Sequence, residues 1–259
     1  LLSFPTRRSS DLIQEELSRQ MQLCMLFDDN QPTIVKHRYL ARNAKREEYR
    51  KLFAVNNIAK EPKPGRAVRE KVLCRLRELL PSYDAVFLCD FGHGLMDEET
   101  AELVQDKARY LVLNCQTNSS NFGLNPITKY HRADAFTLDE KELRLAYPAL
   151  AENEKEALRK LGTHLGTEGW LTRGSEGACC FQAGVFHACP AFTLMVKDTV
   201  GAGDAFYAIS GLYAAAGAPR EACMFMGNIA GALGANIVGN KEAVEKVNVM
   251  KYAGTLMNV

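Results

Sequence analysis

The chain has 259 residues, of which 47% are hydrophobic and 24% charged, a balance typical of a globular protein long enough to bury a core. Its net charge of +1 gives no sign of a nucleic-acid-binding surface or an acidic tail. The eight cysteines show no C-x-x-C spacing, which favours reduced thiols in a cytoplasmic protein over a disulfide framework or a zinc site.

Residues 1–12 are set apart from the rest of the chain. The string FPTRRSSDL, Phe4 to Leu12, resembles the in-frame translation of a sequencing adapter and has no hydrophobic period and no signal-peptide core. We interpret residues 1–12 as an artefactual tail that should pack against nothing. Residues 13–259 are then the domain to be explained, and the natural protein is expected to begin upstream.

The first part of that domain is predicted to hold a weak helix at 13–27, strands at 33–39 and 51–56, and an amphipathic helix at 66–80. Beyond Asp84, strands alternate with helices. The strands are predicted at 85–89, 110–113, 135–138 and 169–172, with helices at 97–108, 140–147 and 154–165. A hairpin of 178–182 and 185–188 follows, and helices at 204–216 and 220–237 close the chain.

This alternation predicts an α/β fold with a mostly parallel sheet that is covered by helices on both faces. The apolar strand at 85–89 ends in Asp90, a pattern typical of a buried parallel strand with functional groups at its carboxyl end. The most apolar stretch, 222–238, contains two asparagines and is too short to span a bilayer, so we interpret it as a packed helix and expect no membrane partner.

The most informative stretch is DTVGAGDAF, residues 198–206. Its glycines let the backbone turn sharply and bring N–H groups against a ligand, and the helix that follows directs its positive end at an anion. Asp204 lies in the first turn of that helix, where it can stay ionised and accept a proton. An anion hole beside a base is what phosphoryl transfer to a hydroxyl requires. A plain glycine-rich turn capped by Asp204 is the alternative for these residues alone.

DTVGAGDAF is similar at every defined position to D-T-x-G-A-G-D-x-F, the signature of the PfkB (ribokinase-like) family of sugar kinases. The resemblance extends over about residues 33–257. It implies a ribokinase-like α/β fold, with Asp204 as catalytic base and the backbone N–H groups of Gly201, Ala202 and Gly203 as the anion hole. No Gly-Gly sugar-binding motif precedes Thr33, so the family's N-terminal strands and much of its lid are expected to be missing.

The same resemblance implies a nucleotide site. TRGSEG, residues 172–177, resembles the family's T-x-G-x-x-G turn, which places Thr172, Gly174 and Gly177 against ATP. Thr199 in the signature and Asn228 in a helix similar to the family's last core helix complete the ATP-binding set. A simple hairpin connection explains the turn equally well, and a buried Asn228 bonded to backbone groups is the alternative for that residue.

Asp139 and Glu142 lie where the family carries N-x-x-E, a motif tied to magnesium, with Asp139 in the position of the asparagine. Two carboxylates three residues apart at a helix start could hold Mg²⁺ through water. They could also be ordinary acidic residues favoured by the helix dipole, and both interpretations remain open. The family resemblance adds a monovalent cation as a further candidate cofactor.

The substrate side resembles one branch of the family, the heptose-7-phosphate kinase half of ADP-heptose synthase. DFGHG, beginning at Asp90, is similar to its D-Y-x-K-G loop, with Gly92 kept and His93 in place of the lysine. TIVKHRYLARN is similar to its T-x-x-K-x-R pattern through Lys36 and Arg38. These likenesses favour a sugar phosphate as substrate. A structural histidine and a solvated basic face are the alternatives.

We therefore predict an ATP-dependent sugar kinase. The altered Asp139, His93 and Asn114 support an alternative, a catalytically inactive module that binds a nucleotide or a sugar on the same fold. The sequence has no early G-x-G-x-x-G and no HxGH motif, which disfavours a dehydrogenase or a nucleotidyltransferase on a doubly wound sheet. A homodimer, and a nucleotidyltransferase fused to the chain or acting as its partner, are the candidate assemblies.

Overall fold

The computed structural model describes residues 21–28, 31–32, 34–43, 48–59, 63–117, 121–192, 196–238 and 242–258. The tail predicted at 1–12 lies outside these residues, as does the first part of the helix predicted at 13–27. Residues 21–27 are described and are not helical, so that part of the prediction is wrong. Most of these residues are exposed, and a short helix without a packed face is marginal in water.

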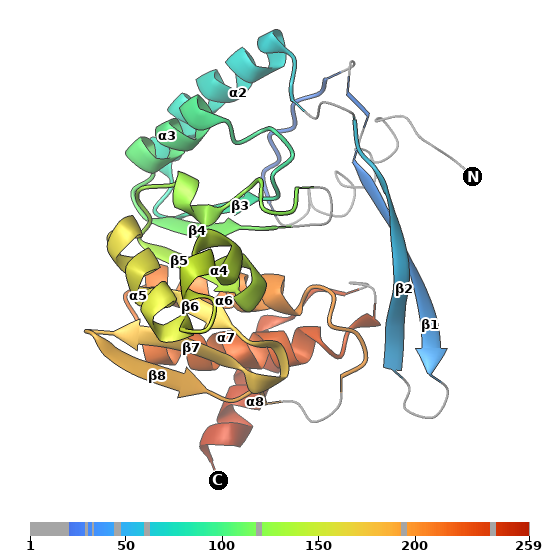
Figure 1. The fold of residues 1–259 in the computed structure, drawn as a ribbon, viewed down its shortest axis with the longest axis vertical. Helices are drawn as coiled ribbons and strands as arrows, with labels where there is room; N and C mark the ends of the chain where they lie inside the picture. The colour runs from blue at the N-terminus through green and yellow to red at the C-terminus, as the bar shows by residue number, and fades with distance from the viewer. Residues whose placement is uncertain are drawn as a thin grey trace.

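The centre of the fold is a sheet of six strands in the order β3-β4-β5-β6-β7-β8 (Figure 1). Its strands are β3 (Val86–Asp90), β4 (Leu111–Cys115), β5 (Ala135–Asp139), β6 (Trp170–Thr172), β7 (Ala178–Gln182) and β8 (Val185–Cys189). The first four are parallel neighbours, and the last two form the predicted antiparallel hairpin. The predicted α/β fold with a mostly parallel sheet is confirmed.

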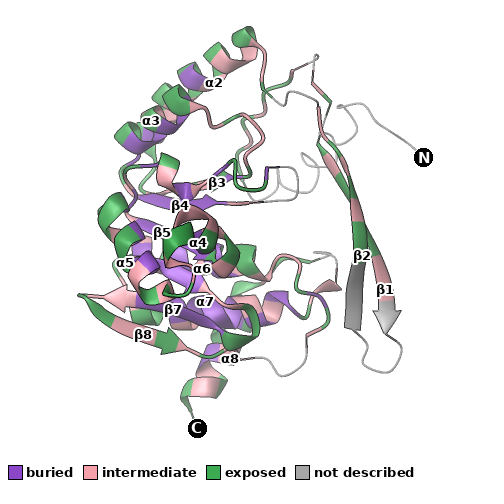
Figure 2. Ribbon diagram, viewed as in Figure 1, coloured by how far each residue is buried: buried purple, intermediate pink, exposed green. Residues whose placement is uncertain are grey.

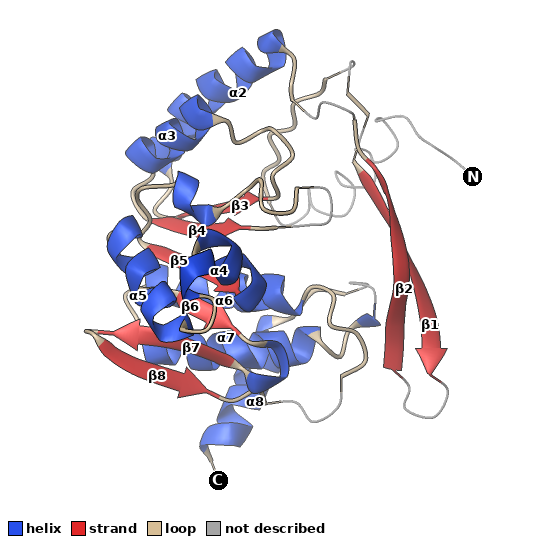
Figure 3. Ribbon diagram, viewed as in Figure 1, coloured by secondary structure: helices blue, strands red, loops and turns tan. Residues whose placement is uncertain are grey.

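The helices cover both faces of this sheet, as Figures 1 and 3 show. They are α2 (Arg66–Leu79), α3 (Glu98–Lys107), α4 (Glu140–Ala146), α5 (Glu154–Leu165), α6 (Ala202–Ala215), α7 (Arg220–Gly234) and α8 (Lys246–Met257). Successive side chains of a strand point to opposite faces of the sheet, so neighbouring residues pack against different helices. Cys179 packs in the layer with α4 and α5, while its neighbour Cys180 packs in the layer with α6 and α7.

The core lies between these layers (Figure 2). All five residues of β4 are buried, which explains why this strand is a continuous apolar run apart from Asn114. The amide of Asn114 donates to the carbonyl oxygen of Thr137 at 3.1 Å and to its hydroxyl at 3.2 Å, so the polar group is satisfied within the sheet.

Two features differ from the sequence prediction or add to it. α8 follows α7, so the expectation that two helices close the chain is wrong. Only Val249 and Ala253 of α8 are buried, and so short an apolar stripe is a weak signal. Second, β1 (Val35–Asn43) and β2 (Glu48–Asn57) pair with each other in a separate two-stranded sheet, where Tyr39 stacks on Phe53 with ring centres 4.4 Å apart.

Among the residues described, none of the helices combines the length and the apolar character needed to cross a membrane.

Candidate active site

The carboxyl ends of β3, β4, β5 and β6 meet at one edge of the sheet because these strands are parallel and in register. The residues at these ends are Asp90, Cys115, Asp139 and Thr172. α6 begins at the same edge, since the amide of Gln116, just after β4, donates to a carboxylate oxygen of Asp204 at 2.9 Å. The edge therefore gathers groups that the sequence predicted for one site.

Gly201 is the N-cap of α6 and has a φ of 87°, a left-handed conformation that favours glycine. The next turn is tight enough for the Ala202 N–H to reach the Thr199 carbonyl at 3.3 Å. Gly203 lies within the first turn of the helix, and a Cβ added there would meet no atom within 4 Å. The helix start thus leaves open space beside amide groups that point out of the helix.

Asp204 is exposed and lies in this first turn, beside a cavity of about 250 Å³. Gly201, Gly234 and Glu242 also line that cavity. The loop that leads into α6 is fixed from behind, because the amides of Lys197 and Asp198 donate to the carbonyl of Ala235 at 3.0 and 3.1 Å. A carboxylate held at a rigid helix start can accept a proton from a hydroxyl group bound next to it.

The turn of residues 172–177 has two glycines with different roles. Gly177 has a φ of 88°, and a Cβ there would lie 2.1 Å from the carbonyl oxygen of Cys189, so the fold itself requires this glycine. Gly174 has a φ of 54° but no atom within 4 Å of an added Cβ. Thr172 donates from its hydroxyl to the Leu138 carbonyl at 3.3 Å. The surface of the turn at Gly174 is therefore open to a ligand.

Asn228 is 7% exposed, and its amide nitrogen donates to the carbonyls of Cys189 and Pro190 at 3.0 and 3.1 Å. These bonds tie α7 to the end of β8. They match the alternative of a buried asparagine bonded to the backbone, and a contact of Asn228 with a nucleotide remains a prediction.

Asp139 and Glu142 form a complete capping box at the start of α4. The carboxylate of Asp139 accepts from the Glu142 amide at 2.8 Å, and that of Glu142 accepts from the Asp139 amide at 3.0 Å. Glu142 also accepts from the amide of Thr117 at 2.9 Å. Burial and the negative charge of Asp139 raise the pKa of Glu142 to about 7. Two carboxylates without full charge compensation suit a hydrated cation beside them.

Asp90 is enclosed on all sides and is only 2% exposed. Its carboxylate forms an ion pair with Lys129 and accepts hydrogen bonds from the Tyr130 hydroxyl at 2.8 Å and the Gly92 amide at 2.9 Å. Burial disfavours its charged form, but these partners outweigh that effect and hold the pKa of Asp90 below its usual range. Asp90 therefore shapes the loop that follows it, with its side chain turned inward.

That loop brings two other predicted substrate-side residues together. His93 is half-buried, and burial together with the positive charge of Lys36 lowers the pKa of His93. Lys36 and Arg38 are two residues apart on β1 and both are exposed. Gly92, with a φ of 67°, permits close packing of this loop, because a Cβ there would lie 1.9 Å from the amide nitrogen of Asn121.

Several residues of this edge were not predicted from the sequence, namely Gln116, Thr117, Lys129 and Tyr130. Gln116 and Thr117 directly follow the buried parallel strand β4. Ligands bind at the carboxyl ends of such strands, so this position in the sequence could have indicated both residues. Lys129 and Tyr130 lie in an irregular segment far along the chain, where no local pattern indicates a partner for Asp90.

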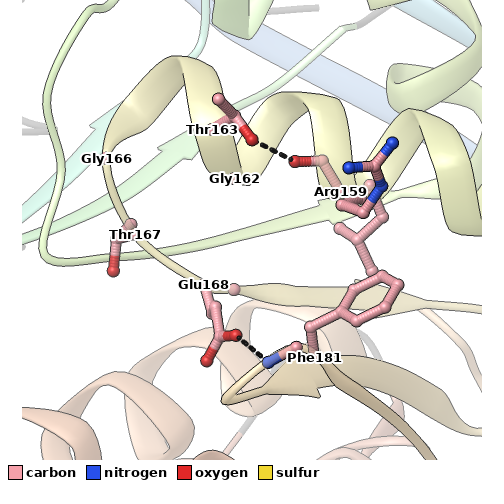
Figure 4. A pocket seen from close by; sticks show the side chains of 10 residues that line it. Arg159, Gly162, Thr163, Gly166, Thr167, Glu168 and Phe181 are labelled. Carbon is pink, nitrogen blue, oxygen red and sulfur yellow. Dashed lines mark hydrogen bonds between the residues drawn. The ribbon is translucent and has the colours of Figure 1, made fainter.

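A second cavity, of about 330 Å³, lies at the amino end of β6 and so at the opposite edge of the sheet (Figure 4). The carboxylate of Glu168 lines it and is occupied by the amides of Ala183 and Gly184, both at 3.1 Å. Its remaining lining is largely glycine and apolar surface. None of the residues predicted for the kinase site lines this second cavity.

Residues 24–246 match the family described as pfkB family carbohydrate kinase. The Bifunctional protein HldE of Helicobacter hepaticus is 25% identical over 239 residues, which are 89% of this chain and 46% of that protein. The chain thus spans about half the length of the curated relatives it matches.

Solved kinase structures share this fold, which confirms the predicted ribokinase-like architecture. Phosphofructokinase-2 from Escherichia coli in complex with potassium has a TM-score of 0.67 at 11% identity, over 85% of this chain and 70% of that one. Ribokinase from Arabidopsis thaliana complexed with ribose and ATP has a TM-score of 0.62 at 19% identity, over 96% of this chain and 79% of that one.

Proposed function

The chain belongs to the pfkB family of carbohydrate kinases, and from that premise we propose that it transfers the γ-phosphoryl group of ATP to a hydroxyl of a sugar phosphate. The observation on which the proposal rests is the start of α6. A left-handed Gly201, an unobstructed Gly203 and the carboxylate of Asp204 come together there in one turn.

In this proposal Asp204 accepts the proton of the attacking hydroxyl. The amides of Gly201, Ala202 and Gly203 stabilise the charge that develops on the transferred group, because the first amides of a helix have no acceptor within the helix. Ala202 must release its 3.3 Å bond to Thr199 to take part. The loop before the helix is held by the bonds of Lys197 and Asp198 to Ala235, which keeps the helix start in place.

The open surface at Gly174 and the neighbouring Thr172 are proposed to contact the nucleotide, together with Thr199. Mg²⁺ bound with ATP would neutralise part of the phosphate charge. Glu142, with Asp139 beside it, is the residue proposed to hold that ion through water. Its raised pKa supports this role, because a nearby cation would favour its charged form. A monovalent cation is proposed as a second ion, by analogy with the potassium complex of the E. coli relative.

The substrate class is proposed from Lys36, Arg38 and His93. Lys36 and His93 are close enough for the lysine to lower the pKa of the histidine, and Arg38 follows on the same strand. Two cationic side chains and an imidazole donor suit a phosphate on the sugar. The resemblance to heptose-7-phosphate kinases and the HldE relative support a heptose phosphate within this class.

The curated relative is bifunctional by name and about twice as long as this chain. We propose that a nucleotidyltransferase, fused or as a separate partner, acts on the phosphorylated product. A homodimer is the proposed assembly of the kinase.

The test is Asp204→Asn, assayed with ATP and a panel of sugars and sugar phosphates. The amide keeps the size of the carboxylate but cannot act as a base, so we expect phosphorylation to fall by at least about a hundredfold while ATP binding persists. Asp106→Asn, an exposed change on α3, serves as the matched control and should keep the parent rate.

An Asp204→Asn variant that phosphorylates at the parent rate would show that this carboxylate is only a helix residue. A parent protein that binds ATP but phosphorylates nothing in the panel would favour the alternative, an inactive nucleotide- or sugar-binding module on the same fold.

A further inference from the structure

Gln116 occupies a junction between three parts of the candidate site. It directly follows β4, and its backbone amide donates to the carbonyl of Asp90 at 2.8 Å. Its own carbonyl accepts from the amide of Asn125 at 3.3 Å. The next amide in the chain, that of Thr117, donates to Glu142. The backbone at Gln116 is therefore held from β3, from the following loop and from α4.

From this anchored backbone the side chain reaches across to α6. Its amide nitrogen donates to one carboxylate oxygen of Asp204 at 2.9 Å, over a separation of 88 residues in the chain. Among the residues that the structure describes, the side-chain hydrogen-bond donor to the Asp204 carboxylate is Gln116. No lysine, arginine or histidine among these residues forms an ion pair with Asp204.

We propose that Gln116 is a positioning residue for Asp204, a role that rests on the proposed kinase function. The neutral amide holds one carboxylate oxygen and thereby turns the other toward the position of the sugar hydroxyl. Gln116 acts through Asp204 and needs no contact with the reacting atoms.

The other titratable groups near Asp204 make the neutral donor important. Cys89, at the end of β3, lies near Asp204, and its thiol carries no positive charge. Glu242 lines the same cavity as Asp204 and would add negative charge there. Among the described residues, Asp204 thus has a neutral amide as its side-chain hydrogen-bond partner and an acidic residue in the same cavity.

The experiment compares Gln116→Leu and Gln116→Glu with the parent chain. Leu keeps most of the size but removes the donor, so we expect kcat to fall about tenfold with the KM for ATP within about twofold. Glu places a second carboxylate against Asp204, so the acid limb of the kcat–pH profile should move to higher pH by roughly one unit. Gln116 is partly exposed and Asp204 is exposed, so the thermal midpoints of both Gln116 variants should stay near that of the parent.

A purely structural role would not move the pH profile, and the double variant separates the two roles. If Gln116 acts through Asp204, then Gln116→Leu with Asp204→Asn should be no slower than Asp204→Asn alone. Parent values of kcat and pH profile in both Gln116 variants, or a multiplicative loss in the double variant, would overturn the inference while leaving the kinase function intact. Full activity of Asp204→Asn would overturn both.

Discussion

Some glycines of this site are required by the fold, whereas another is not required by any contact within the protein. Gly201 and Gly177 are required by backbone conformation, since both have a positive φ and Gly177 also abuts the Cys189 carbonyl. Gly203 has neither restriction. A glycine that the protein itself does not need, placed at a helix start beside a carboxylate, points to something outside the protein that must come close.

Gly203→Val should therefore leave the thermal midpoint nearly unchanged while weakening ATP binding by at least about tenfold, because the side chain would occupy the space of the phosphate. Gly201→Val should differ, since a β-branched residue at a φ of 87° is strained, and it should lower the stability by about 1 to 3 kcal/mol. Calorimetric titration with a nonhydrolysable ATP analogue and thermal unfolding measure the two effects. Unaltered nucleotide affinity of Gly203→Val would argue against a phosphate at this turn.

At the scale of elements, α6 lies so close to the sheet that glycine is needed where they touch. A Cβ at Gly211 would lie 2.6 Å from the ring of Phe87 on β3 and 2.7 Å from the side chain of Val112 on β4. Phe87 is in turn 37% exposed, because β3 is the edge strand of the sheet. This close contact sets the distance between α6 and the sheet, and so the position of Asp204 relative to the strand ends.

Gly211→Ala should thus destabilise the protein by about 1 to 3 kcal/mol through overpacking. Gly254→Ala is the matched control, because it is also a helical glycine but has no atom within 4 Å of an added Cβ. That change should be neutral or stabilising by up to about 1 kcal/mol, the difference in helix propensity. Urea unfolding of both variants measures this contrast, and equal effects would mean that α6 packs less tightly on the sheet than its distances to Phe87 and Val112 indicate.

At the scale of the whole molecule, the carboxyl-end edge of the sheet concentrates charge that the fold only partly compensates. Asp90 is neutralised by Lys129, whereas Glu142 receives backbone donors but lies beside Asp139. The opposite edge holds the cavity near Glu168, whose carboxylate is already bonded. Glu142 is therefore the group at this edge through which the stability of the molecule should depend on pH.

Glu142 gives a specific pH dependence in the absence of divalent metal. Its pKa of about 7 lies above the ordinary value of a glutamate, so between about pH 4.5 and pH 7 the folded state binds a proton that the unfolded state does not. The free energy of unfolding should therefore fall as pH rises through that window, by roughly 2 to 4 kcal/mol from this group.

Glu142→Gln cannot titrate and should lose this part of the pH dependence, as measured by urea unfolding at pH 5 and pH 8. Glu98→Gln, an exposed acidic residue in the first turn of α3, is the control and should keep the parent slope. Parallel curves for the parent and Glu142→Gln would contradict the raised pKa.

The sequence by itself determined the elements and the centre of the site. Hydrophobic periodicity and the glycine and asparagine caps are local properties, so nearly every strand and helix from Arg66 to Gly234 lies within a few residues of its predicted place. DTVGAGDAF identified Asp204 and its helix start because a left-handed glycine, a short turn and a first-turn carboxylate are adjacent in the chain. The short apolar stripe of α8 gave no comparable signal.

Only the tertiary structure decided which groups meet. Asp90 and Tyr130 are 40 residues apart, and Gln116 and Asp204 are 88 apart, and nothing local in either segment specifies its partner. Their contacts exist because four parallel strands end at one edge and α6 packs across them through Gly211. The same packing directs the Asp90 side chain inward, where it accepts from the Gly92 amide, and it brings the Asn228 amide to the carbonyl of Cys189 at the end of β8. Both contacts form because buried polar groups need hydrogen-bond partners.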